Sequence, residues 1–118
     1  MRGKRHAGRE LTRFPCPKLG GEVEFTAERE AHIRDRHPDL LPDHREKIAE
    51  TLADPDFIRR SIRMATARLF SKWYNDLRNG RHVVVVVVSE GGATARHWII
   101  TAYIARSLGE GEVEWQRS

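Results

Sequence analysis

Alternating apolar and polar residues in the second half of the chain predict β-strands. Phe57–Ile62 is typical of an extended segment, and alternation continues through Arg68–Asn75 and Arg96–Ala105. Val83–Val88 is an unbroken run of six valines, which indicates a central strand covered on both faces, because a strand with one wet face would alternate. Asn79–Gly80 is a hairpin signal, and the short connections predict an antiparallel meander of three strands.

Two helices are predicted ahead of this meander. Thr26 is a good N-cap, and the helix that follows is expected over residues 27–37, because a proline comes next. Asp43 and Glu46 have the spacing of a capping box, so a second helix is expected over residues 43–53.

Two further short strands are predicted outside the meander. Glu22–Phe25 alternates acidic and apolar residues before the first helix, and Glu112–Trp115 could add a last edge strand. The whole pattern predicts an α+β fold in which two short helices precede an antiparallel meander.

Length and cysteine content place this pattern in one domain. A chain of 118 residues can bury a core without disulfides or a metal ion. The single cysteine, Cys16, has no partner for an internal disulfide, no apolar run is long enough to cross a membrane, and no signal-peptide pattern begins the chain. We therefore expect a cytoplasmic protein without a membrane partner.

The net charge of +4 is unevenly distributed. Residues 1–18 hold six basic residues and one acidic residue, which leaves 15 basic and 16 acidic residues, or −1, for the rest of the chain. We expect residues 1–20 to be a flexible basic arm and residues 21–118 to be the folded domain. A polyanion would bind the domain through local clustering of cations rather than through net charge.

The most unusual segment places two histidines and two arginines at the end of the first predicted helix. His32 and Arg36 are four residues apart and flank Ile33, so they would lie at the rim of the core. His32 and His37 are about 140° apart around the helix, which counts against a helical zinc site. Alternatively, these side chains are solvated and the histidines cap the C-terminus of the helix, where a cation is favourable.

A second group of candidate residues lies on the predicted strands. Lys72 is expected on one face with Phe70 and Tyr74, and Thr101 on one face with Ile99 and Tyr103, so each strand offers a face that mixes apolar and polar groups. The structural alternative is that Lys72 extends to solvent at an edge and that the Tyr103 hydroxyl satisfies a backbone group.

Histidine, arginine, lysine, threonine and tyrosine together, without a carboxylate cluster, are the set used for metal-independent RNA cleavage. Histidine acts as a base or an acid near neutral pH, and arginine and lysine bind phosphate. Hydroxyl groups can donate to a non-bridging phosphoryl oxygen. The reaction uses the 2′-hydroxyl, so it is restricted to RNA.

The order of these motifs resembles the phage-associated nuclease-like families of the barnase, EndoU, colicin and RelE superfamily. The resemblance rests on Phe-Thr-x(5)-His-Ile-x-x-Arg-His-Pro (Phe25 to Pro38), Pro-x-x-Ile (Pro55 to Ile58), a strand with Lys72, a valine strand and Ile-Ile-Thr-Ala-Tyr (Ile99 to Tyr103). It covers roughly residues 22–115.

The resemblance implies an α+β fold in which two N-terminal helices pack on one face of a four- to five-stranded antiparallel sheet, leaving the other face for RNA. It implies a site made of His32, Arg36, His37, Lys72, Thr101 and Tyr103. One histidine would be the acid or base, with the roles of the two left open. Lys72 and Arg36 would bind the phosphate, and Thr101 would orient it or donate to it.

The function expected from this set is that of a metal-independent endoribonuclease without a cofactor, cleaving RNA by transesterification from the 2′-hydroxyl. It would be a toxin of a toxin–antitoxin pair or a phage effector, with an antitoxin or immunity protein as partner. The first alternative is a non-catalytic module that binds nucleic acid or protein, favoured by the net charge of −1 outside the basic segment. A metal-dependent hydrolase is disfavoured by the histidine spacing.

Overall fold

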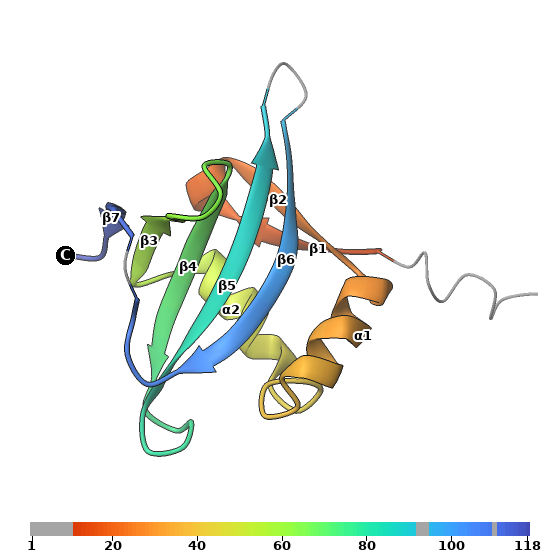
Figure 1. Ribbon diagram of the computed structural model, residues 1–118, viewed down its shortest axis with the longest axis vertical. Coiled ribbons are helices and arrows are strands. Elements are labelled where there is room, and N and C mark those ends of the chain that lie inside the picture. Colours follow the sequence, from red (N-terminus) through yellow and green to blue (C-terminus); the bar gives the residue numbers. More distant parts are fainter. Residues whose placement is uncertain (1–10, 92–94, 110) are drawn as a thin grey trace, which may run out of the picture.

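The computed structural model describes residues 11–91, 95–109 and 111–118, which form a seven-stranded sheet and two α-helices (Figure 1). The strands and helices in chain order are β1 (Leu11–Cys16), the 3-10 helix η2 (Pro17–Leu19), β2 (Gly21–Thr26), α1 (Ala27–Arg36), α2 (Arg45–Ala53), β3 (Phe57–Arg60), β4 (Ala67–Tyr74), β5 (Arg81–Glu90), β6 (Arg96–Ala105) and β7 (Val113–Gln116). Across the sheet the order is β1-β2-β6-β5-β4-β3-β7. Among the helices described here, none is long and apolar enough to span a bilayer.

The α+β class is confirmed, but the predicted sheet of four to five antiparallel strands behind two N-terminal helices is wrong. The described sheet has seven strands and is mixed, because β2 runs parallel to β6 where Glu24 pairs with Trp98. Both helices follow the β1–β2 hairpin instead of preceding the whole sheet. The meander of β4, β5 and β6 is antiparallel as predicted.

Strand β1 lies inside the segment that was predicted to be an arm. Its Phe14 and Cys16 are buried, and the single cysteine is a free thiol whose pKa is raised to about 11 by burial. The prolines flanking Cys16 read as a chain break, but an edge strand tolerates Pro15 because one side of the strand has no ladder to complete. The sheet therefore begins before residue 21, and residues 1–10 of the predicted arm lie outside the described residues.

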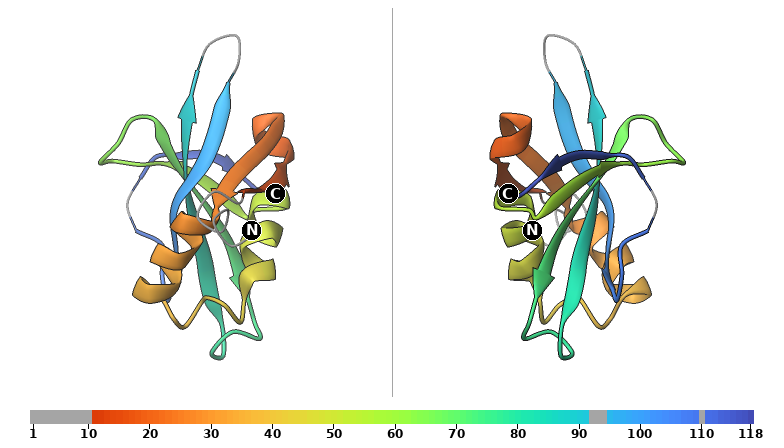
Figure 2. Two further views of the ribbon diagram at one scale, coloured as in Figure 1. Left: turned by 90° about the vertical axis from the view of Figure 1, so that its right-hand side faces the viewer. Right: turned by 90° about the vertical axis from the view of Figure 1, so that its left-hand side faces the viewer.

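The main core lies between α2 and the sheet, which curves around that helix. Helix α2 contacts β1, β4 and β5, whereas α1 lies along β6 and β2 at the edge where the β1–β2 hairpin turns away. Figure 2 shows α2 and the hairpin on one side of the central strands and the turn after β3 on the other. We call these two sides the helix face and the open face.

The valine run of β5 is covered on both faces, as predicted. All six valines are at most 9% exposed. Val83, Val85 and Val87 belong to the core on the helix face, whereas the alternate valines pack on the open face against side chains of β4 and β6 and against Leu108. The open face is therefore covered in part by its own strands and by the chain after β6.

The chain after β6 returns to the opposite edge of the sheet. The Arg59 guanidinium donates to the Gly109 carbonyl at 2.6 Å, and the Arg60 amide donates to the Glu112 carbonyl at 2.8 Å. Strand β7 then pairs antiparallel with β3, so the last predicted edge strand is confirmed at this position.

Helix α1 begins as its sequence predicts, and α2 does not. The Thr26 hydroxyl accepts a hydrogen bond from the Arg29 amide at 3.0 Å. The predicted capping box at Asp43 is wrong, because α2 begins at Arg45 and its N-cap, His44, makes no side-chain capping bond. The preceding chain is fixed instead by tertiary packing, since Leu40 and Leu41 are fully buried.

Removing the Thr26 cap is expected to destabilise the protein. Thr26→Ala should lower the free energy of unfolding by about 1 kcal/mol, because the Arg29 amide loses its acceptor. Thr26→Ser should retain most of the stability, and Thr66→Ala, at an exposed turn, provides the matched control. Urea unfolding measures all three; equal stability of Thr26→Ala and wild type would contradict the capping role.

Candidate functional site

A cavity of about 590 Å³ lies on the open face, between the β3–β4 turn and β6. It is lined by Arg59, Ser61, Ile62, Arg63, Met64, Ala67, Leu69, Val86, Ile100, Thr101, Tyr103 and Gly109. Its lining combines apolar side chains with guanidinium and hydroxyl groups. A site of this composition can hold an aromatic base against its apolar side chains and a phosphate at its polar groups.

Two of the predicted site residues, Thr101 and Tyr103, line this open-face cavity because of a bulge in β6. Ile100 is an extra residue, since Ile99 and Thr101 pair with consecutive valines of β5. Ile99 therefore packs into the core of the helix face. The predicted face shared by Ile99 and Thr101 is wrong, whereas Thr101 and Tyr103 do line one cavity.

His37 lies beside Tyr103 at the end of α1. Its backbone amide closes the helix on the Ile33 carbonyl at 2.6 Å, and its ring lies against Tyr103 of β6. The imidazole and phenol rings have centroids 6.0 Å apart and planes inclined by 39°. An imidazole, a phenol and the Thr101 hydroxyl therefore lie in one region of the open face.

Arginines from the β3–β4 turn add positive charge to the same cavity. Arg59 is 3% exposed, and its guanidinium holds the Gly109 carbonyl, whereas Arg63 is exposed. The Ser61 hydroxyl shapes the turn by accepting from the Arg63 and Met64 amides at 3.1 and 3.2 Å. Sequence reasoning missed these residues, although three arginines within residues 59–63 are a signal for an anion site.

Lys72 lies on the helix face, away from Thr101 and Tyr103. It pairs with Val83, and its ammonium group binds the Asp54 carbonyl at 3.0 Å and carboxylate at 3.3 Å. Arg117 binds the same carboxylate, and these hydrogen bonds, that of Arg117 foremost, lower the pKa of Asp54. Lys72 and Arg117 therefore join β4 and the C-terminal segment to the end of α2 through Asp54.

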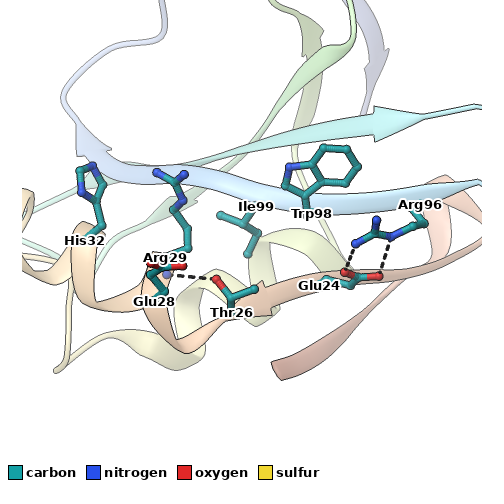
Figure 3. A pocket seen from close by; sticks show the side chains of 8 residues that line it. All are labelled: Glu24, Thr26, Glu28, Arg29, His32, Arg96, Trp98 and Ile99. Atoms are coloured by element: carbon teal, nitrogen blue, oxygen red, sulfur yellow. Dashed lines mark hydrogen bonds and ion pairs between the residues drawn. The ribbon is translucent and has the colours of Figure 1, made fainter. Parts of the chain in front are cut away.

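His32 and Arg36 are not gathered around Tyr103 either. His32 lines a second cavity of about 500 Å³ between α1 and β6 (Figure 3). Arg36 is exposed on α1, and no ion pair is found for it within the described parts of the chain. Of the six predicted site residues, the structure therefore groups His37, Thr101 and Tyr103, places His32 in a neighbouring cavity, leaves Arg36 exposed on α1, and separates Lys72.

Residues 11–91, 95–109 and 111–118 contain no group of three or more His, Cys, Asp and Glu side chains that could hold a metal ion. The polar groups that line the open-face cavity are hydroxyl and guanidinium groups, and the His37 imidazole lies beside its Tyr103; such groups suit an anion such as phosphate.

Comparison with known proteins leaves the family resemblance a prediction. No family model, no curated protein and no solved structure gives a significant match to this chain.

Proposed function

We propose that the protein is a metal-independent endoribonuclease whose centre is formed by His37, Tyr103 and Thr101 on the open face. The observation that carries the proposal is the contact of the His37 and Tyr103 rings beside a cavity that Thr101 and two arginines line. These groups supply a proton acceptor, two hydroxyl donors and positive charge, which is what phosphoryl transfer from a 2′-hydroxyl requires.

In the proposed reaction, the neutral His37 imidazole takes the proton of the 2′-hydroxyl, and the 2′-oxygen bonds to the adjacent phosphorus. The bond from phosphorus to the 5′-oxygen breaks, and that oxygen leaves with the proton of the Tyr103 hydroxyl. A 2′,3′-cyclic phosphate and a 5′-hydroxyl result. The proton on His37 then returns to the Tyr103 oxygen, which restores both groups. Arg63 and Thr101 stabilise the charge on the non-bridging oxygens.

The direct test is incubation of the purified protein with single-stranded RNA in EDTA. The expected products end in 2′,3′-cyclic phosphate, and DNA of the same sequence stays intact because it lacks the nucleophile. RNA that remains intact would sink the proposal. Cleavage that needs an added metal ion would replace it with the metal-dependent alternative.

The non-catalytic alternative uses the same face. Ile62 and Met64 are 68% and 43% exposed at the mouth of the cavity, which is unusual for large apolar side chains and suits a partner protein. If the protein is a toxin, an antitoxin or immunity protein that covers this mouth would block RNA entry. Binding of RNA without turnover would favour this alternative.

A substitution at Lys72 distinguishes the proposed open-face centre, which does not include this residue, from a centre made of all six predicted residues. Lys72→Gln is expected to leave the rate of RNA cleavage unchanged, because its ammonium group is held by Asp54 on the helix face. The measurement is the initial rate on a short labelled RNA. A loss as large as that of His37→Ala would show that Lys72 reaches the phosphate and would contradict the smaller centre.

A further inference from the structure

The second cavity is a groove between α1 and the edge of β6. Strand β2 pairs with β6 only where Glu24 meets Trp98, and the chain then turns into α1 after Thr26. Beyond this point the edge of β6 faces a helix instead of a strand, which leaves the space of about 500 Å³. We call it the α1–β6 groove; Figure 3 shows Glu24, Thr26, Glu28, Arg29, His32, Arg96, Trp98 and Ile99 around it.

One ion pair is already formed in the groove. Arg96 donates to both oxygens of Glu24, at 2.8 and 3.3 Å, and this hydrogen bonding lowers the pKa of Glu24. The same guanidinium carbon lies 5.4 Å from the centroid of the Trp98 ring. The pair therefore neutralises the acidic side chain and supports one side of the indole.

Two basic side chains in the groove are available for an anion. Arg29 and His32 lie one turn apart on α1, and Figure 3 shows both extending toward β6, on the side of the Trp98 indole. Within the described residues, neither side chain forms an ion pair or a hydrogen bond. The remaining acid, Glu28, lies in the first turn of α1, where the helix N-terminus favours a carboxylate.

The groove leads along β6 into the proposed centre. Trp98 and Thr101 pair with Val88 and Val86, so the bulge leaves them two ladder positions apart, roughly 7 Å at the usual rise of a strand. Helix α1 follows the same direction, so that Arg29 and His32 precede His37, whose ring contacts Tyr103. An aromatic ring, a guanidinium and an imidazole thus precede the centre on the same strand and helix.

We infer that the α1–β6 groove binds the nucleotide of single-stranded RNA that neighbours the cleaved one. Its base stacks on Trp98, and its phosphate is held by Arg29 and His32. The geometry fits the combination of aromatic stacking and backbone cations that single-strand binding uses. The position next to the cleaved nucleotide rests on the proposed function, whereas the binding of single-stranded RNA in the groove does not.

The test compares a 2′-O-methyl mononucleotide, which cannot span the centre and the groove, with a 2′-O-methyl octanucleotide; neither can be cleaved because the nucleophile is blocked. Trp98→Leu and Arg29→Gln should each lower the ratio of octanucleotide to mononucleotide affinity by about tenfold, which is within the range for loss of one stacked base. Arg34→Gln is the matched control, an exposed arginine of the same helix outside both cavities, and should leave the ratio unchanged.

The outcomes separate this inference from the ribonuclease proposal. An unchanged ratio in both variants, or an equal fall in Arg34→Gln, overturns the groove, even if RNA is still cleaved in a manner that depends on His37. A ratio that depends on Trp98 and Arg29 in a protein that cuts no RNA overturns the ribonuclease alone. Arg29→Gln, a surface change, decides the matter if Trp98→Leu does not fold, as judged by circular dichroism.

Discussion

His37→Ala is expected to slow RNA cleavage by about 100- to 10,000-fold, the usual contribution of a general base. The helix should survive the change, because the backbone amide of residue 37, not its ring, bonds to the Ile33 carbonyl. Initial rates on a fluorescent RNA and circular dichroism spectra would measure the two effects separately.

Two further variants test whether the loss of activity is specific to the proposed centre. Tyr103→Phe keeps the ring beside His37 but removes the hydroxyl, so it should lower the rate while leaving the fold intact. His44→Ala removes a histidine that lines neither cavity and should not change the rate. If His37→Ala cleaves RNA as fast as wild type, the centre lies elsewhere.

Phe70→Ala is expected to have the largest effect on stability. Phe70 is fully buried in β4 on the helix face, and its truncation should lower the free energy of unfolding by about 3–5 kcal/mol. That loss is a large share of the roughly 5–15 kcal/mol that stabilises a typical domain. Urea or thermal unfolding would measure it, with the expected result a marked fall in the transition midpoint.

Phe57→Ala is the matched control for Phe70. Phe57 lies on the neighbouring strand β3, is only partly buried, and pairs with Ser71 instead of joining the core of the helix face. Phe57→Ala should lower the free energy of unfolding clearly less than Phe70→Ala does. Equal losses would mean that the open face contributes as much to the core as the helix face does, contrary to the packing of the two valine sets on β5.

Local patterns predicted the individual elements well. Thr26 and the following acids specify the start of α1, and the alternation around Val83–Val88 specifies the meander, because capping and the pleat of a strand depend on residues close in sequence. The second helix was located but its cap was not. There the burial of Leu40 and Leu41 prevailed over the local capping preference.

The membership of the sheet could not be predicted in the same way. Glu24 and Trp98 pair in parallel although most of the chain lies between them, and no local signal specifies such a contact. Strand β1 was hidden by Pro15, which only its position at the edge permits. The first error comes from a pairing between distant segments, whereas β1 pairs with β2 in a local hairpin and was missed because of its proline.

For the candidate site too, some features follow from the local sequence and others only from the tertiary structure. By itself, the sequence determined the residue types, an imidazole at the end of a helix and hydroxyls on a strand, because these follow from the chain itself. Tertiary structure alone decided that His37 meets Tyr103, that one bulged residue puts Thr101 on the open face, and that Lys72 faces α2. A strand has a period of two, so a shift of one residue reverses its faces, and helix packing then selects which face stays open.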